Sequence, residues 1–330
     1  MSKKLPSTNS FRAILVALTI GFVGCGNQTA RTAFTQTTTQ VNENLPKIVA
    51  TTSVLCDLTK QVAGDTVNLT CLIPPTANPQ FYKPKPEDRR AIEQANLILY
   101  NGYNLEPNSI KLIKATKSTA RKIAVGQVAM SKQQKFQKGG KKALDPHLWL
   151  NTKNAIGMVE VINSNLIKLE SSNAEVYTSN TKKIANELTQ LDSWIKSRIA
   201  SIPTKERKLV TTSDALNYYS KAYGIPLVGG LQNISPDENL TDARVKNLAT
   251  NIKQAKVSTV FSEATINPNL LQSVAKEADV KISDRKLYAE GLGEPGSEAD
   301  TYQKMMIANT RTIVEGLGGT YLMFEAKSRK

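Results

Sequence analysis

The chain has 330 residues, with 43 Lys or Arg, 28 Asp or Glu and a single His, so its formal net charge at pH 7 is +15. Basic chains often bind nucleic acid, but here the lysines are spread along predicted helices and loops, without the basic, aromatic-interleaved motifs of nucleic-acid binders. A single histidine, with no recognisable nucleophile–base motif and no glycine-rich phosphate loop, argues against an enzyme.

The N-terminal segment has the layout of an export signal. Three basic residues precede the apolar run Ala13–Val23, which is too short to cross a bilayer by itself. The run is followed by Gly24 and Cys25, which resembles a lipobox, whose cysteine is acylated and becomes the first mature residue. We therefore predict a lipoprotein signal peptide over residues 1–24 and lipidation of Cys25. The alternative is a plain signal peptide that contains a cysteine.

The segment 25–45 is rich in Thr, Gln and Asn and has too few large apolar side chains to offset the entropy lost on folding, so we predict a flexible tether. No other stretch has the ~18 apolar residues of a transmembrane helix. The mature chain is thus expected to be exported and held by its lipid on the periplasmic face of the cytoplasmic membrane. Removal of residues 1–24 leaves a net charge of +12, which suits an anionic envelope surface better than nucleic acid.

Two stretches far apart in the chain share one pattern. KIVATTSVLCDLTKQVAG begins at Lys47, and KLVTTSDALNYYSKAYG begins at Lys208. Each has a basic residue, a short β-branched run, a Thr/Ser-rich turn and an amphipathic helix that ends at a glycine, Gly64 or Gly224, suited to a left-handed cap. We interpret them as the first strand–helix unit of each of two similar lobes.

Strand and helix patterns alternate through both lobes. The further predicted strands are Val67–Ile73, Leu97–Tyr100 and Lys122–Val125 in the first lobe, and Pro226–Leu231, Ser258–Phe261 and Val280–Ile282 in the second. The predicted helices include Glu87–Gln94, Leu240–Ala255 and Pro268–Glu277. This alternation indicates an α/β fold with mainly parallel sheets covered by helices on both faces.

A long helix is predicted between the lobes. Ser172 with Glu175 three residues later is a capping-box start, and Pro203 marks the end. Between them, apolar residues recur on one stripe: Tyr177, Ile184, Leu188, Leu191, Ile195 and Ile199. About 28 helical residues span roughly 40 Å and form a stiff spine that limits the lobes to small rocking motions. The predicted division is an N-terminal lobe at 46–170, a linking helix at 171–202 and a C-terminal lobe at 203–330.

Cys56 and Cys71 remain after removal of the signal peptide, in an exported chain where disulfides persist. Cys56 begins a predicted helix after one strand, and Cys71 lies near the end of the next strand. Parallel strands bring these two ends together, so a disulfide is geometrically reasonable. The alternative is two buried free thiols.

Four polar residues lie beyond predicted strand ends. They are Gln80 after NLTCLIP, His147 in DPHLWL, Glu263 after STVF and Glu290 after VKIS. Ligands of open α/β sheets bind beyond the carboxyl ends of the strands. Since each lobe supplies two of these loops, all four are expected to meet in the cleft.

Over residues 46–320 the sequence resembles the solute-binding lipoproteins of zinc and manganese ABC importers, bacterial solute-binding protein family 9. The first-lobe loop of that family usually reads Asp-Pro-His-x-Tyr-x-Pro-x-Pro-x-Asp, and NPQFYKPKPED keeps this frame with Gln80 in place of the histidine. The second motif, Asp-Pro-His-x-Trp, is intact around His147. The resemblance implies two similar lobes with mainly parallel sheets, joined by a long spine helix, in the cluster A-I type of solute-binding fold.

The resemblance also assigns positions in the second lobe. Zinc-type members often have a third histidine in Thr-His-Asp-Ala, where this chain has Ser213 in TSDA. Manganese-type members use a glutamate after the next strand, and Glu263 matches it. The last ligand is usually the aspartate of Leu-Tyr-x-Asp-x-Leu-Gly-Glu, whereas LYAEGLGE supplies Glu290, one methylene longer. The implied metal ligands are therefore His147, Glu263, Glu290 and Gln80.

One imidazole, two carboxylates and one amide oxygen form a set of mainly hard ligands that neutralises a divalent cation. Such a set suits Mn²⁺ or Fe²⁺ better than Zn²⁺, which favours nitrogen and sulfur. Gln80 offers only a neutral carbonyl oxygen, so we expect weaker affinity than with a histidine. Each residue also has a simpler interpretation: Gln80 as a neighbour of a ligand, His147 as an interior histidine, and Glu263 and Glu290 as surface charges.

The loop before the second motif differs from that of zinc-type members, which often carry a His- and acid-rich loop there. SKQQKFQKGGKKALDP has five lysines and no acidic residue before Asp145, so it repels cations, and we expect a disordered, solvated loop.

The resemblance and the export signal predict a monomeric solute-binding lipoprotein that captures a divalent metal ion and delivers it to the permease of an ABC importer. The alternative is a paralogue that kept the scaffold but lost tight metal binding, and that acts in envelope interaction or cell adhesion or binds another small ligand.

Overall fold

The computed structural model describes residues 44–130, 133–138, 141–228, 241–265 and 268–327. The predicted signal peptide, the lipidation site Cys25 and nearly all of the predicted tether lie outside these residues. Among the described helices, none is both long enough and apolar enough to cross a membrane.

The first lobe contains a four-stranded parallel sheet in the order β2-β1-β3-β4. Its strands are β1 Lys47–Ala50, β2 Asn68–Cys71, β3 Leu97–Tyr100 and β4 Arg121–Ala124. All four match strands predicted from the sequence, although β2 is shorter than expected. Because the strands are parallel, their carboxyl ends lie along one edge of the sheet.

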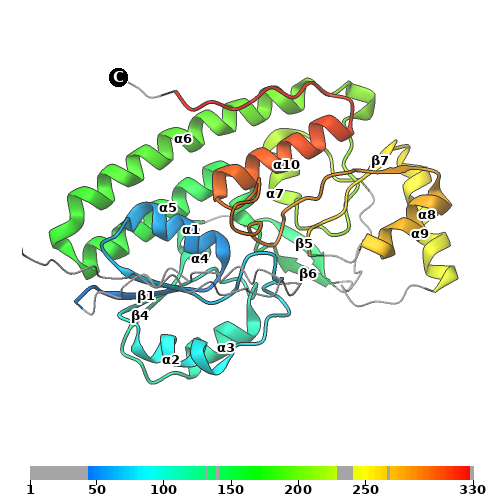
Figure 1. Ribbon diagram of the computed structural model, residues 1–330. Helices are drawn as coiled ribbons and strands as arrows, with labels where there is room; N and C mark the ends of the chain where they lie inside the picture. Colours follow the sequence, from blue (N-terminus) through cyan, green and yellow to red (C-terminus); the bar gives the residue numbers. More distant parts are fainter. Residues whose placement is uncertain (1–43, 131–132, 139–140, 229–240, 266–267, 328–330) are drawn as a thin grey trace, which may run out of the picture. The chain divides into compact units, whose positions relative to one another are not determined.

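Helices cover both faces of this sheet. Figure 1 shows α1 (Ser53–Ala63) and α5 (Thr152–Leu169) on one face, and α2 (Pro86–Gln94) and α3 (Pro107–Ala115) on the other. The alternation of side chains along β1 produces the two layers, because successive residues point to opposite faces. Ile48 and Ala50 pack in the core with α1 and α5, whereas Val49 packs with residues of α2 and α3. The short helix α4 (Val125–Ala129) follows β4.

The second lobe repeats this arrangement with shorter strands. β7 (Thr259–Val260) pairs in parallel with β8 (Lys281–Ile282). Isolated parallel bridges join Leu209 to Leu227 and Thr211 to Phe261. In space, the strand segment at Leu227 lies beside that at Leu209–Thr211, which is followed by β7 and β8. Numbered along the chain, this order is 2-1-3-4, as in the first-lobe sheet. Residues 229–231 of the predicted strand Pro226–Leu231 lie outside the described residues.

The second-lobe helices are α7 Asn217–Tyr223, α8 Asp242–Ala255, α9 Pro268–Ala278 and α10 Tyr302–Gly316. A small core between α8, α9 and the strands contains Val210, Ile252, Val260 and Val274. By contrast, α10 packs on α6 and contributes Met305 to the large core that also holds first-lobe residues. The lobes therefore share one hydrophobic core, which favours a stiff connection.

The predicted spine helix is α6, Ala174–Ala200, and the predicted apolar stripe is buried along it. Its start differs from the prediction. A 3-10 turn, η2 Ser171–Asn173, precedes it, Asn173 is the N-cap, and the hydroxyl of Ser172 donates to Glu170. The predicted capping box is therefore wrong, because the tighter turn moves Ser172 out of the capping position. Two further 3-10 turns are η1 Leu148–Leu150 and η3 Thr204–Glu206.

The two predicted glycine caps differ from each other. Gly224 takes the left-handed helical conformation, with φ 69° and ψ 37°. Gly64 has φ 59° but ψ −134°, a conformation outside the left-handed helical region. Both positions favour glycine because of the positive φ, but only Gly224 matches the predicted cap.

The lysine-rich stretch before His147 forms an antiparallel hairpin, so the expectation of a disordered loop was wrong. Its strands are β5 Lys135–Lys138 and β6 Lys141–Leu144. The base of the hairpin is held by backbone groups: the amide of Asp145 donates to the carbonyl of Gln134, and the amide of Gln134 donates to the hydroxyl of Tyr218 in the second lobe. The first contact closes the base of the hairpin and the second ties it to the second lobe. The charge pattern reveals neither.

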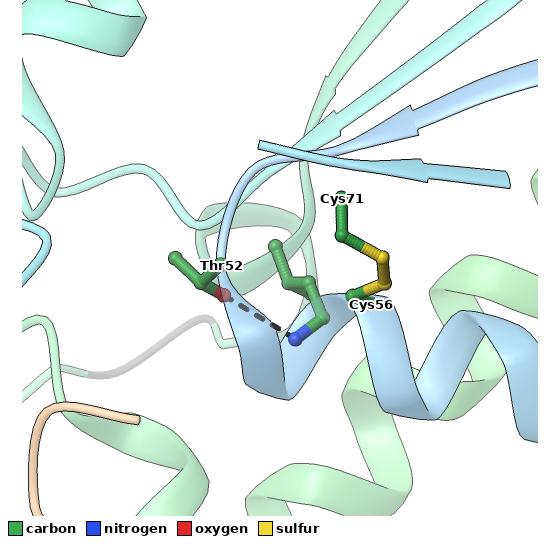
Figure 2. The surroundings of a disulfide bond; sticks show 4 residues. Thr52, Cys56 and Cys71 are labelled. Atoms are coloured by element: carbon green, nitrogen blue, oxygen red, sulfur yellow. Dashed lines mark hydrogen bonds between the residues drawn. A yellow bond between two sulfur atoms is a disulfide. The ribbon is translucent and has the colours of Figure 1, made fainter. Parts of the chain in front are cut away.

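Cys56 and Cys71 form a disulfide that joins α1 to the end of β2 (Figure 2), with their Cα atoms 5.6 Å apart. One turn earlier, the side chain of Thr52 accepts from the amide of Leu55 and caps the start of α1. The disulfide and the cap hold the start of α1 at the carboxyl edge of the sheet, where the candidate site lies.

Candidate metal centre

His147 is held in one orientation by the residue two positions before it. Oδ1 of Asp145 accepts from the backbone amide of His147 at 3.0 Å and lies 2.8 Å from its Nδ1. Both residues are buried, and Trp149 packs edge-on against the imidazole with ring centroids 5.5 Å apart. A carboxylate that binds Nδ1–H fixes the tautomer and directs Nε2 away from Asp145. Nε2 is therefore the atom that His147 presents to the cleft.

Two of the predicted ligands, His147 and Gln80, contact a third, Glu290. Nε2 of His147 lies 3.4 Å from Oε1 of Glu290, and the side-chain amide of Gln80 donates to the same oxygen at 3.2 Å. Gln80 and His147 belong to the first lobe and Glu290 to the second, so the site lies between the lobes. Oε2 of Glu290 is buried without a hydrogen-bond partner among the described residues.

The loop that carries Glu290 is fixed against the first helix. The amide of Leu292 donates to Oγ of Ser53 at 3.0 Å. Gly291 allows this approach, because a Cβ at its position would lie 2.7 Å from the same oxygen. A side chain at position 291 would force Ser53 or this loop to shift and would disturb the hydrogen bond between Ser53 and Leu292.

Glu263 is held by hydroxyl groups of the second lobe. Its Oε1 accepts from Ser213 at 2.8 Å and from Thr212 at 3.2 Å, and its backbone forms a parallel bridge with Leu287. Ser213 occupies the position where the resemblance gives zinc-type members a histidine. In this chain that position orients the carboxylate of Glu263.

Burial and neighbouring charges shift the pKa values in the site. Burial, reinforced by Glu290, raises the pKa of Glu263 to about 7. Burial lowers the pKa of His147, but the charge of Glu290 and the hydrogen bond to Asp145 together outweigh it and raise the pKa to about 10. Glu263 also interacts electrostatically with both Glu290 and His147. The site therefore favours positive charge at its centre, whether as a proton on His147 or as a cation.

The donor set suits a divalent cation, although its side chains contact one another. Within the described ranges, no three His, Cys, Asp or Glu side chains are arranged around one point as metal ligands. Oε1 of Glu290 instead contacts both His147 and Gln80. Binding a cation between His147 and Glu290 would require these contacts to be exchanged for bonds to the ion.

Sequence reasoning missed a buried polar cluster behind the His147 loop. Oε1 of Glu106 accepts from the amide of Asn101 at 2.6 Å and from the hydroxyl of Thr51 at 2.8 Å. The side-chain amide of Asn101 donates to the carbonyl of Pro146 at 3.0 Å. Burial raises the pKa of Glu106 to about 7. The available signal was an acidic residue directly before Pro107, just after β3.

A protein-family model described as "Zinc-uptake complex component A periplasmic", ZnuA, matches residues 48–316. The chain belongs to the ZnuA family. This confirms the resemblance read from the loop motifs, and it confirms the metal-transport type of solute-binding function that they predict.

Relatives of this ZnuA-family chain are named as transporter components. It is 30% identical to the metal ABC transporter substrate-binding lipoprotein ScbA of Streptococcus cristatus, over 93% of this chain and 98% of the relative. It is 33% identical to the manganese ABC transporter substrate-binding lipoprotein PsaA of Streptococcus mitis, over 82% and 89%. These relatives are solute-binding proteins and are not named as enzymes.

The fold of the ZnuA-family chain is that of the periplasmic zinc-binding protein TroA of Treponema pallidum. The structures agree with a TM-score of 0.76 at 27% identity, covering 83% of this chain and 99% of TroA. The predicted fold class, two lobes with mainly parallel sheets and a long linking helix, is thereby confirmed.

Proposed function

We propose that this ZnuA-family protein captures a divalent metal ion between its lobes, with His147, Glu263, Glu290 and Gln80 as ligands, and presents it to the permease of an ABC importer. The supporting observation is that Glu290 of the second lobe contacts both His147 and Gln80 of the first. Glu263 lies near enough to interact electrostatically with His147 and Glu290. In such a site the ion joins the two lobes.

We propose Mn²⁺ or Fe²⁺ as the preferred cargo over Zn²⁺. The names of the relatives do not decide this, since PsaA is named for manganese and TroA for zinc. The chemistry of the side chains favours the harder ions, because one imidazole faces two carboxylates and an amide oxygen. Gln80 binds through its carbonyl oxygen, after its amide group has rotated away from Glu290.

We propose that the protein works as a monomer, exported and anchored through lipidated Cys25 to the outer face of the cytoplasmic membrane, without nucleic acid as a partner. The relatives are named as lipoproteins of ABC transporters, which supports the anchor and the permease partner. The comparisons lend no support to the alternative of an envelope-interaction or adhesion paralogue.

Equilibrium dialysis with Mn²⁺, Fe²⁺ and Zn²⁺ tests the proposal on the protein without residues 1–24 and with Cys25→Ser. The expected result is one bound ion per chain, lost in a His147→Ala, Glu263→Ala double variant. Glu175→Ala, which removes an exposed carboxylate of α6, serves as the control and retains binding. Absence of binding below the millimolar range for all three ions overturns the proposal.

A further inference from the structure

A basic groove lies between the start of α2 and the length of α3, on the sheet face opposite α1. We use "basic groove" for the cavity of about 710 Å³ bordered by Lys83, Lys85, Arg89 and Lys111, with Pro84 and Leu112 among its apolar lining. All four cationic side chains are exposed, and its lining includes no acidic residue. None of the ion pairs within the described part of the chain involves any of these four.

Hydrogen bonds hold the walls of the basic groove in place. The side-chain amide of Asn108, at the start of α3, donates to the carbonyl of Tyr82 at 2.8 Å. Asp88 in α2 accepts at 2.8 Å from both the hydroxyl of Tyr82 and the amide of Lys85. The segment between β2 and α2 is thus tied to both helices, and the cationic side chains extend from a fixed backbone.

The same segment enters the metal centre. Gln80, which contacts Glu290, is separated from Lys83 in the basic groove by only Phe81 and Tyr82. Phe81 is 57% exposed, an unusual exposure for a large aromatic side chain. A partner in the basic groove therefore contacts the loop that reaches the cargo.

We propose that the basic groove binds an acidic, partly apolar polypeptide segment of the permease that receives the metal; this rests on the proposed function. Four cations that form no ion pair with the described residues attract a segment of opposite charge and steer its approach. The apolar lining accommodates the side chains between the acidic ones. A polypeptide segment fits into a cavity, whereas a flat bilayer surface contacts only its rim.

The test uses a fluorescein-labelled peptide of alternating Glu and Leu as the probe, with fluorescence anisotropy at low and high ionic strength. The full mature protein is compared with a Lys83→Glu, Lys111→Glu variant. The control is Lys182→Glu, Lys183→Glu, which makes the same charge change at exposed positions of α6. We expect the groove variant to bind about tenfold more weakly, as for the loss of two exposed ion pairs, and the control to bind like the wild type.

If the peptide affinity falls equally in the groove variant and the control, the attraction is to net charge, and the proposal is overturned. Failure of the wild-type protein to bind the peptide also overturns it. Stronger binding to phosphatidylglycerol vesicles that is lost in the groove variant assigns the groove to the membrane instead, and also overturns it. Mn²⁺ binding is measured on the same samples. Absence of Mn²⁺ binding by the wild-type protein counts against the proposed function. Only the peptide result decides whether the basic groove binds an acidic segment.

Discussion

Nε2 of His147 lies 3.4 Å from Oε1 of Glu290, although the imidazole belongs to the first lobe and the carboxylate to the second. Two donor atoms bonded to one ion at about 2.1 Å lie roughly 3 to 3.5 Å apart, so this separation already matches that of two ligands of one metal. In the proposed site, these two donors would therefore need only small side-chain rotations to bind an ion.

Asp145→Asn is expected to weaken Mn²⁺ binding by about 10- to 100-fold, the usual loss when the partner of a metal-bound histidine is changed. The substitution removes the negative charge that orients His147 and strengthens it as a ligand. Isothermal titration calorimetry measures the affinity. Asp300→Asn is the control, because Asp300 pairs with Lys304 outside the metal centre. Equal affinities of the two variants would contradict the role of Asp145.

Gln80→His is expected to raise the affinity for Zn²⁺ more than that for Mn²⁺, because a second imidazole makes the site richer in nitrogen. The ratio of the Zn²⁺ affinity to the Mn²⁺ affinity should increase by about tenfold or more. Competition between the two ions in dialysis measures this ratio. Gln80→Ala is the matched variant that removes the amide oxygen. If Gln80→Ala binds Mn²⁺ like the wild type, Gln80 is a neighbour of the ligands and not one of them.

Metal affinity is expected to increase with pH. His147, with a pKa of about 10, and Glu263, with a pKa of about 7, hold protons that a cation must displace. Each displaced proton makes the affinity rise about tenfold per pH unit below the pKa of its group. Titration of Mn²⁺ between about pH 6 and pH 8, in buffers of different ionisation enthalpy, measures the affinity and the protons released. A flat profile without proton release would contradict this coupling.

The same pKa values predict how the stability of the protein without metal depends on pH. Both are raised above the ordinary values, 4.5 for Glu263 and 6.5 for His147. Their stabilising contributions are therefore complete below those ordinary values and are lost as the pH rises through about 7 and about 10. Thermal unfolding in the presence of a chelator should show a lower midpoint at pH 8 than at pH 6, and a Glu263→Gln variant a smaller difference. An unchanged midpoint would contradict the shifts.

Glu106→Ala is expected to destabilise the domain and weaken metal binding. It leaves the amide of Asn101 and the hydroxyl of Thr51 without their acceptor, at a cost of about 1–3 kcal/mol for each buried group. Asn101 also holds the carbonyl of Pro146, directly before His147. Denaturant unfolding and Mn²⁺ titration measure the two effects. Glu106→Gln keeps an acceptor oxygen and should recover most of both; failure to do so would show that the charge itself is needed.

Removal of the disulfide by a Cys56→Ala, Cys71→Ala double substitution is expected to lower the free energy of unfolding. The two cysteines are 15 positions apart, and a cross-linked loop of that size stabilises by about 3 kcal/mol through the unfolded state. Urea denaturation with and without reductant measures the loss. Added reductant should destabilise the wild type and leave the variant unchanged; equal sensitivity of both would contradict the assignment.

Local patterns were reliable where one face of an element must be buried. The stripe from Tyr177 to Ile199 predicted α6, and the β-branched run after Lys47 predicted β1, because burial of such faces drives both. The same local reasoning failed at Ser172, where a 3-10 turn took the place of the capping box. It also failed in the lysine-rich hairpin, whose backbone bonds involve Tyr218 of the other lobe.

The amino-acid sequence by itself determined the α/β alternation, the family and the identity of the candidate ligands, because strand periodicity and motif frames are properties of consecutive residues. Only the tertiary structure decided that Glu290 meets both His147 and Gln80, that Ser213 binds Glu263, and that Glu106 supports the His147 loop through Asn101. These contacts join residues far apart in the chain. Their distances depend on how the lobes and loops pack, which no local pattern encodes.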